Sequence, residues 1–196
     1  MSRRDALSLN CVVLAAGAST RFGSPKQLAR FQGQTLLQRV LATAHEVTAT
    51  TITVVVGAHA ADVVEVLPPG RATVLVNREW REGIASSLRA AVRALPGACD
   101  GVLIVLADQP LVAAAQLNRL VSVWRRQPKR IVASQYEGTT GVPAIFPRWC
   151  FSELCALRGD QGARALILRH ADHVTRLALP EAAVDIDQPE DLLNLT

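Results

Sequence analysis

The 196-residue sequence is poor in aromatic residues and in long apolar runs, and these two shortages exclude two kinds of partner. Aromatic residues make up only 4% of the chain, too few for the stacking surfaces that bind single-stranded nucleic acids. The net charge of +4 is spread along the sequence and gathers on no recognisable reading element. No apolar run approaches the ~20 residues of a membrane-spanning helix. We therefore expect neither a nucleic acid nor a membrane as partner.

Paired cysteines are also missing, which bears on the cellular compartment. The cysteines at positions 11, 99, 150 and 155 form no CxxC pair and no zinc-ligand spacing. We interpret them as small buried thiols in a reducing compartment. Two arginines precede an apolar stretch near the N-terminus, as in a twin-arginine signal, but Asp5 and Asn10 interrupt it. Cleavage near Ala18 would also remove a strand that the fold needs, so we expect a cytoplasmic protein.

Two familiar nucleotide-binding motifs are absent as well. The chain contains no GxGxxG, which disfavours an NAD-linked oxidoreductase. It contains no GxxxxGK[ST] either, because Gly23 is followed by Ser24, Pro25 and Lys26. A Walker-type phosphate loop is therefore excluded.

What the chain does contain is an alternation of β-branched runs and helical stripes. Apolar runs predict strands over 11–16, 51–56, 72–76, 102–107, 130–134, 143–146 and 174–179. Apolar residues with helical spacing predict helices over 35–47, 84–95 and 117–124. Thr35 and Gln38 have capping-box spacing, and Asp160 is placed to cap a further helix that carries Leu166. The alternation predicts one α/β domain over residues 1–196, with a mainly parallel sheet between helical layers.

The first strand runs into the loop "AAGASTRFGSPK", which holds small residues and two cations. Ligands of such sheets bind outside the carboxyl ends of the strands. Around Gly17 the backbone N–H groups can approach an anion closely, Arg21 can fork onto phosphate oxygens, and Lys26 adds a compact charge. We predict that this loop wraps the phosphates of a nucleotide. The alternative is a plain surface turn with exposed cations.

Carboxylates at two further places predict a metal site. Asp108 ends the run 102–107, where a carboxylate is costly unless it is solvated, hydrogen-bonded or bound to a cation. Asp185 and Asp187 alternate in "VDIDQPEDL", so an extended backbone points both to one face. Mg²⁺ takes one or two carboxylates and fills its shell with waters and phosphates. We predict Mg²⁺ on Asp108 with Asp185 or Asp187; the alternative is that these residues cap turns or a helix start.

The stretch "NREWREGIASSL" follows the run 72–76 and offers polar groups to a base or ribose. Asn77 stands where that strand ends, Gly83 opens a helix, and Ser86 lies in its first turn. First-turn N–H groups have no partner within the helix and can receive a ligand. The alternative is a capping cluster in which Trp80 is a packing residue.

Together these stretches resemble a known family. "LAAGASTRFGSPKQL" resembles the signature of the MobA-like nucleotidyltransferases, which include molybdenum cofactor cytidylyl- and guanylyltransferases. The resemblance extends through "NREWREGIASSL", "LADQPLV", "GVPAIF", "LRGDQGARALI" and "DIDQPEDLL", about residues 9 to 195. It implies a three-layer Rossmann-like nucleotidyltransferase fold with a mixed, mainly parallel sheet. The first loop resembles the cytidylyl branch, since the guanylyl branch usually reads "LAGG…RMG.DK".

The resemblance also implies roles for single residues. Nucleotide contacts are implied at Leu14, Ala15, Ala16, Gly17, Arg21, Lys26, Asn77, Gly83 and Ser86. Catalytic roles are implied for Arg21, Lys26 and Asp108, with Mg²⁺ on Asp108 and on Asp185 or Asp187. The acceptor would be bordered by Gly141, Pro143, Gly159, Asp160 and Arg164. Val142 stands where relatives often place His or Asn, which removes a polar contact to the acceptor.

The expected reaction is transfer of CMP from CTP to the terminal phosphate of molybdopterin, or of its metal-loaded form, with release of pyrophosphate. A molybdoenzyme or its chaperone would then be a protein partner. One alternative is an enzyme that uses GTP or accepts a sugar or alcohol phosphate. Another is a non-catalytic chaperone that holds molybdenum cofactor. The presence of both loop cations and carboxylates favours the enzyme.

Overall fold

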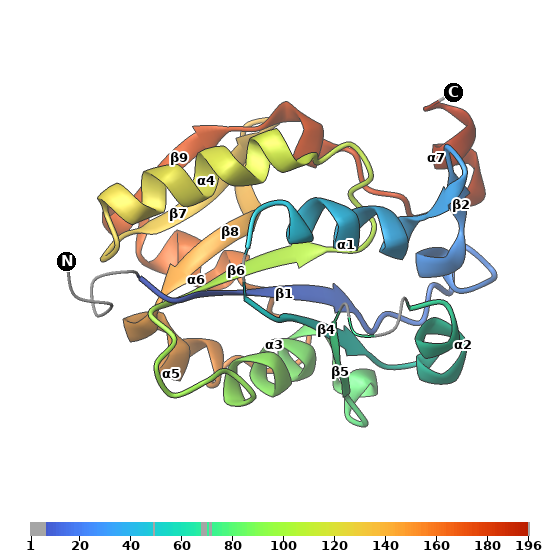
Figure 1. Cartoon of the computed structure of the whole chain (residues 1–196), viewed down its shortest axis with the longest axis horizontal. Coiled ribbons are helices and arrows are strands. Elements are labelled where there is room, and N and C mark those ends of the chain that lie inside the picture. Colours follow the sequence, from blue (N-terminus) through green and yellow to red (C-terminus); the bar gives the residue numbers. More distant parts are fainter. Residues whose placement is uncertain (1–6, 49, 68–69, 71, 196) are drawn as a thin grey trace.

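A seven-stranded mixed sheet forms the centre of the molecule (Figure 1). The computed structural model describes residues 7–48, 50–67, 70 and 72–195. The spatial order of the strands is β5-β4-β1-β6-β8-β7-β9. Their bounds are β1 Leu9–Ala15, β4 Ile52–Val56, β5 Thr73–Val76, β6 Gly101–Leu106, β7 Ile131–Tyr136, β8 Thr139–Pro147 and β9 Val174–Ala178. Only the pairings of β8, with β6 and with β7, are antiparallel within this sheet. The predicted strands and the mainly parallel sheet are confirmed.

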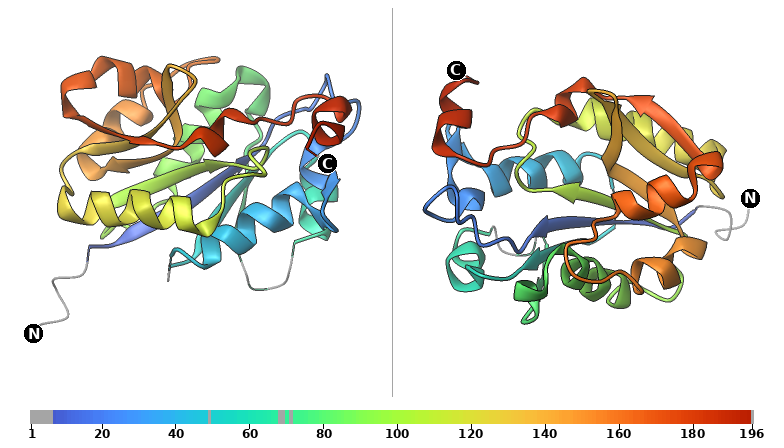
Figure 2. Two further views of the ribbon diagram at one scale, coloured as in Figure 1. Left: turned by 90° about the horizontal axis from the view of Figure 1, so that it is seen from above. Right: turned by 180° about the vertical axis from the view of Figure 1, so that it is seen from behind.

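Helices cover both faces of the sheet, which makes three layers (Figure 2). One face is covered by α1 (Leu36–His45) and α4 (Ala114–Arg126), the other by α3 (Ile84–Arg93), α5 (Phe151–Leu154) and α6 (Arg164–Arg169). Strand β1 is buried along its whole length, and successive side chains point to opposite faces. Val13 packs in the core between the sheet and the helices α1 and α4, and Val12 packs in the core on the opposite face. This two-sided burial explains why the strand reads as continuously apolar.

The helix predictions hold for the long elements and fail for some details. The capping box of α1 is confirmed: the Gln38 N–H donates to Thr35 Oγ1 at 3.1 Å, and the Thr35 N–H donates to Gln38 Oε1 at 3.0 Å. Helix α4 extends beyond the predicted 117–124 at both ends. The prediction that Asp160 caps α6 is wrong, because Ala163 holds that position without a side-chain bond. The Asp160 carboxylate lies against Gly83 instead.

Two short helices and a small hairpin escaped the prediction, because elements of so few residues show no periodicity. They are α2 (Ala60–Glu65), α5 and the pair β2 (Arg30–Phe31) and β3 (Gln34–Thr35). The helix start that was the alternative role of Asp187 is present, since α7 (Pro189–Leu193) begins two residues later. The hairpin and the C-terminal segment share a small core of their own, formed by Phe31, Leu36 and Ile186. This core lies beyond the carboxyl end of β1, on the right in Figure 1.

The cysteines fit the expectation of buried thiols except at one position. All four are free, and only Cys155 is partly exposed. Burial raises the pKa of Cys11 and that of Cys150 to about 12, so both thiols stay protonated and unreactive. In the part of the chain that the structure describes, every helix is too short or too polar to cross a membrane.

Candidate active site

A cavity of about 410 Å³ opens at the carboxyl ends of β1 and β6. Its size falls within the range of small-molecule sites, roughly 300–1,000 Å³. The predicted site residues that line it are Leu14, Ala15, Ala16, Gly17, Lys26, Gly83, Asp108 and Asp160. Residues outside that prediction that also line it are Ala18, Gln27, Trp80, Arg81, Ile84, Ser87, Leu106 and Ala107. The structure therefore brings the first loop, the end of β6 and the start of α3 around one space.

The predicted cations and two of the predicted carboxylates form a cluster at this cavity. Lys26 Nζ lies 2.7 Å from Asp108 Oδ2 and 2.9 Å from Asp187 Oδ1. The Arg21 guanidinium lies 2.7 Å from the other oxygen of Asp187. The side chain of Lys26 is only 15% exposed, whereas that of Arg21 is 69% exposed. Lys26 is thus held in place, while Arg21 stands in solvent.

The protonation equilibria follow from these contacts. Burial alone would lower the pKa of Lys26, but the charge of Asp108 and the hydrogen bonds to Asp108 and Asp187 outweigh it and raise the pKa. The hydrogen bond from Lys26 lowers the pKa of Asp187, although partial burial opposes it. Lys26 is therefore an ammonium and Asp187 a carboxylate at neutral pH.

The C-terminal segment brings Asp187 to this place. The Ile186 N–H donates to the Asp108 carbonyl oxygen at 2.9 Å, and the Ile186 side chain is fully buried. The N–H groups of Asp187 and Gln188 both donate to Asp191 Oδ2 at 2.8 Å. Asp185 is exposed at the surface, yet the atoms packed around its carboxyl group and the charge of Asp108 raise its pKa to about 6. Of the two alternating carboxylates, Asp187 is the one that contacts Lys26.

A buried glutamine shapes the first loop. Gln27 Nε2 donates to the carbonyl oxygens of Ala15 and Gly17, at 3.0 and 3.1 Å. Ser19 adopts a positive φ of 54°, and its hydroxyl accepts the Lys26 N–H at 3.1 Å. A methyl group on Gly17 would meet no atom within 4 Å. The loop is therefore held by the Gln27 side chain, while the space beside Gly17 is open, which suits a close approach of a ligand to the backbone.

The predicted base-side residues lie behind the cavity wall. Asn77 and Ser86 are buried and do not line the cavity. The Asn77 amide group donates to Ser86 Oγ at 2.8 Å and to Ser87 Oγ at 3.0 Å, and its oxygen accepts the Glu79 N–H. These contacts do not make the predicted capping cluster, because the N-terminus of α3 has no side-chain cap and Trp80 lines the cavity. Ser87, one turn along α3, is the residue of this hydrogen-bonded group that lines the cavity.

Gly83 packs tightly against the loop that precedes α6. Its φ of +112° belongs to a region that only glycine adopts readily, and a Cβ there would lie 2.5 Å from the Gly159 carbonyl oxygen and would clash with Asp160 Oδ1. The Gly159 carbonyl oxygen accepts the Ala85 N–H at 3.1 Å. The expectation that first-turn N–H groups receive a ligand is therefore wrong for Ala85, and also for Ser86, which donates to the Gly83 carbonyl oxygen.

A buried arginine holds the same two segments together, and no sequence motif marked it. Arg89 is only 6% exposed and forms ion pairs with Glu82 and, at 3.3 Å, with Glu79. Its guanidinium also donates to the Leu157 carbonyl oxygen at 3.0 Å. Arg89 thereby ties the turn before α3 to the loop that carries Asp160.

The other predicted acceptor residues lie outside the cavity lining. Gly141 and Pro143 are buried in β8, where the Pro143 carbonyl oxygen accepts the Ser134 hydroxyl at 2.6 Å. A Cβ on Gly141 would lie 2.5 Å from the Tyr136 hydroxyl, so packing alone accounts for this glycine. Arg164 is exposed at the start of α6.

The carboxylates of the cluster fit a hard divalent cation. Asp108 Oδ1 is buried without a hydrogen-bond partner, and its second oxygen shares the Lys26 ammonium with Asp187. Mg²⁺ and similar ions need only one or two carboxylates when phosphates and waters complete the shell. Among the described residues no group of three or more His, Cys, Asp or Glu is arranged to hold a metal. A nucleotide's phosphates would therefore have to supply further ligands.

The chain is similar to known proteins over most of its length. The family model of the MobA-like NTP transferase domain matches residues 11–174. The purine catabolism protein PucB of Bacillus subtilis is 30% identical over 164 residues, which cover 80% of this chain and 78% of PucB. The bifunctional protein GlmU of Rhodopseudomonas palustris is 40% identical over 134 residues. These cover 65% of this chain and 27% of GlmU, so the chain spans about a quarter of that relative.

A solved structure of similar size shares the whole fold. The crystal structure of Rv0371c from Mycobacterium tuberculosis is 32% identical and superposes with a TM-score of 0.84, over 97% of this chain and 98% of that one. A second structure of Rv0371c, in complex with manganese, has a TM-score of 0.80 at 29% identity, with the same coverage.

Proposed function

This chain belongs to the family of MobA-like NTP transferase domains, and we propose that it is a cytidylyltransferase that acts on molybdopterin. In the proposed reaction an oxygen of the pterin phosphate attacks the α-phosphorus of CTP. The bond from that phosphorus to the bridging oxygen breaks, and pyrophosphate leaves. One domain over residues 1–196 carries the activity, and a molybdoenzyme or its chaperone receives the product.

The observation that carries the proposal is the position of Lys26. Its ammonium lies at the cavity between two carboxylates and beside the open backbone of the first loop. An arriving triphosphate offers oxygens that can replace Asp187 as a partner of Lys26. Charge develops on these oxygens as the pyrophosphate leaves, so a cation that is already in place stabilises the transition state without reorganising.

Other residues of the loop have separate tasks in this proposal. The backbone of Ala15, Ala16 and Gly17 binds the nucleotide, and Gln27 keeps these peptides in position. Arg21 is free to turn from Asp187 to the leaving pyrophosphate, because an exposed ion pair is worth only about 0–1 kcal/mol. The acceptor phosphate is already anionic and needs no strong general base, so catalysis consists of positioning and charge neutralisation.

Asp108 and Asp187 would hold Mg²⁺ in the working enzyme. A bound Mg²⁺ supplies Lewis-acid stabilisation of the phosphate oxygens. The unpartnered Asp108 oxygen supports this role, as does the manganese complex of Rv0371c.

The choice of CTP is supported by the first loop, which resembles the cytidylyl branch, and by Asp160. An ionised carboxylate only accepts hydrogen bonds. Asp160, which the resemblance places at the acceptor, lies in the cavity wall beside Gly83. In this proposal it contacts the base instead, where it would accept from the amino group of cytosine and oppose the carbonyl of uracil. Guanine also offers N–H donors, which keeps GTP as the competing nucleotide.

The test measures pyrophosphate release with Mg²⁺ and molybdopterin, with CTP, GTP, ATP and UTP in parallel. We expect release with CTP only, and only when molybdopterin is present. Lys26→Ala should lose about 10²–10³ in turnover. Arg119→Ala removes an exposed cation from α4, a helix that contributes no residue to the cavity lining, and should leave turnover unchanged. Release with GTP would reassign the base, and no release with any nucleotide would refute molybdopterin as the acceptor, leaving a transferase with another acceptor or a protein that only binds the cofactor.

A further inference from the structure

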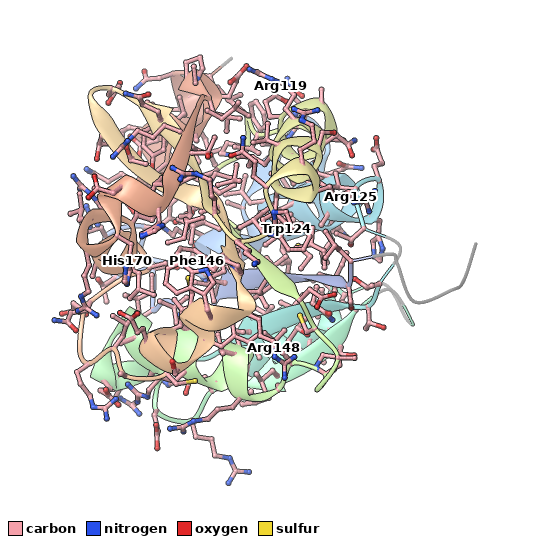
Figure 3. All side chains as sticks on the ribbon, turned by 90° about the vertical axis from the view of Figure 1, so that its left-hand side faces the viewer. Arg119, Trp124, Arg125, Phe146, Arg148 and His170 are labelled. Atoms are coloured by element: carbon pink, nitrogen blue, oxygen red, sulfur yellow. The ribbon has the colours of Figure 1, made fainter. Side chains whose placement is uncertain are left out.

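A second cavity, of about 730 Å³, lies at the end of the sheet opposite the active-site cavity. Its lining residues are Lys129, Arg130, Trp149, Glu153, His170 and His173. Trp149 follows closely after Pro147, which pairs with Gly101 at the beginning of β6, whereas Asp108 lies just past the end of that strand. Figure 3 faces this end of the molecule and shows His170 on it. The two cavities are therefore separated by the length of the sheet.

A fixed and exposed indole forms part of this cavity. Trp149 is 40% exposed, whereas Trp124 is fully buried. The Trp149 N–H donates to the Lys129 carbonyl oxygen at 2.9 Å. The rings of His170 and His173 meet the indole nearly at right angles, with centroids 5.0 and 6.3 Å away. These contacts hold the ring without covering it, so it offers an aromatic surface whose orientation is already set.

Positively charged side chains outnumber carboxylates around the indole. The carboxylate among the lining residues, Glu153, accepts hydrogen bonds from His170 at 2.9 and 3.0 Å and from Arg169 at 2.9 Å. These bonds lower the pKa of Glu153, which is therefore ionised and already partnered. Within the described residues, the Lys129 ammonium and the His173 ring make no hydrogen bond or ion pair.

Arg130 adds a positive charge that cannot move away. Its guanidinium donates to Thr175 Oγ1 at 2.9 Å and to the carbonyl oxygens of Asp172 and Val174 at 3.0 Å. Because carbonyl and hydroxyl oxygens carry no formal charge, these bonds leave the positive charge of Arg130 uncompensated. The cavity thus combines an available aromatic surface with an excess of positive charge.

We propose that this cavity binds a small planar anion, an aromatic ring that carries a phosphate or carboxylate group. The ring stacks on Trp149, and the anionic group lies at Lys129 and His173. The volume falls in the range of small-molecule sites, and an aromatic surface with a few convergent polar groups is their usual lining. The site is distinct from the proposed transferase reaction, since none of its residues lines the active-site cavity.

The test uses tryptophan emission with phenyl phosphate as the probe and cyclohexyl phosphate as a control of equal charge without an aromatic ring. A Trp80→Phe background removes the indole of the active-site cavity and leaves Trp149 and the buried Trp124. We expect phenyl phosphate to quench the emission at concentrations where cyclohexyl phosphate does not. A parallel titration with CMP distinguishes a nucleotide from another aromatic phosphate as the natural ligand.

Two variants tie the effect to this cavity. Trp149→Leu should abolish the quenching, and Lys129→Ala should weaken binding about two- to fivefold, as expected for a solvated charge contact. Lys26→Ala, in the active-site cavity, should change neither the quenching nor the affinity for phenyl phosphate. Binding of phenyl phosphate by calorimetry that survives in Trp149→Leu, or is lost in Lys26→Ala, would overturn the proposal. Equal binding of cyclohexyl phosphate, or no binding of phenyl phosphate at millimolar concentration, would overturn it as well.

Discussion

Replacing Gly83 with alanine should destabilise the protein far more than the same change at Gly17, although both glycines line the active-site cavity. The reason lies in what the new methyl group would meet. At Gly83 it would lie 2.5 Å from a backbone oxygen of Gly159, and the backbone there has a φ of +112°. At Gly17 it would meet nothing within 4 Å, and no positive φ is present.

The magnitude follows from two separate costs at Gly83. A residue with a Cβ in this glycine-only region of backbone conformation costs roughly 1–3 kcal/mol. The clash also displaces Gly159, and with it the 3.1 Å hydrogen bond from the Ala85 N–H, which is worth roughly 0.5–1.5 kcal/mol. The free energy of unfolding should therefore fall by about 2–4 kcal/mol. In a chain of this length that corresponds to a drop in Tm of about 5–15 °C.

Gly17→Ala should change the free energy of unfolding by no more than about 1 kcal/mol, and it can even stabilise the fold, because the unfolded chain loses freedom. Its effect should appear in binding, since the methyl group stands where the nucleotide has to approach the loop. We expect the Kd for CTP to rise about tenfold, which equals about 1.4 kcal/mol.

The assay is urea unfolding of both variants and the parent, followed by calorimetric titration with CTP. The reasoning predicts a crossed result, with stability lost in Gly83→Ala and affinity lost in Gly17→Ala at unchanged stability. A Gly83→Ala protein that unfolds at the urea concentration of the parent would refute the packing argument. A Gly17→Ala protein with full affinity for CTP would show that the ligand does not approach the loop there.

Three further predictions concern charged residues of the site. Asp108→Asn should lower pyrophosphate release by about 100-fold or more while the protein stays folded, and unchanged release would remove Asp108 from the mechanism. Arg89→Met leaves Glu82 unpaired and should lower the free energy of unfolding by about 2 kcal/mol, measured by urea unfolding; a stability equal to the parent would mean that the buried guanidinium holds nothing together. The pKa of Asp187 is lowered by Lys26, so its contribution to stability is full above the unfolded value of about pH 4 and is lost as the pH falls further. Asp187→Asn should therefore lose less stability than the parent between pH 5 and about pH 3, and identical acid profiles would contradict this ion pair's role.

The sheet could be predicted because its strands carry their own burial pattern. A strand such as β1, covered on both faces, has to be apolar at every position, and that run stands out in the sequence. The capping box of α1 could be predicted for a similar reason, since Thr35 and Gln38 are local partners. The α2 and α5 helices are too short to repeat an apolar pattern, whereas α7 is marked only by its start, where Pro189 follows the capping residue Gln188.

Some residues of the candidate site could be predicted from the sequence, and others could not. The arrangement of Arg21 and Lys26 with Asp108 follows from strand ends that meet at one edge of the sheet. The choice of Asp187 over Asp185 as the partner of Lys26 depends on the backbone bond from Ile186 to Asp108, which no pattern of carboxylates contains. Gln27 and Arg89 were not predicted, because they bond to backbone oxygens that only the fold brings close. Nothing in the sequence around a polar residue shows that its side chain is buried.

The ion cluster at the active-site cavity has a consequence for how the enzyme meets its nucleotide. Arg21 and Lys26 face Asp108 and Asp187, so the formal charges of these four groups cancel before any ligand arrives. The cluster itself therefore adds little to the long-range attraction of a triphosphate, which comes from the net charge of +4 on the whole chain and weakens as ionic strength rises. Affinity should depend instead on the concentration of divalent cations, because the two carboxylates that a nucleotide displaces from the cations need a new counter-ion.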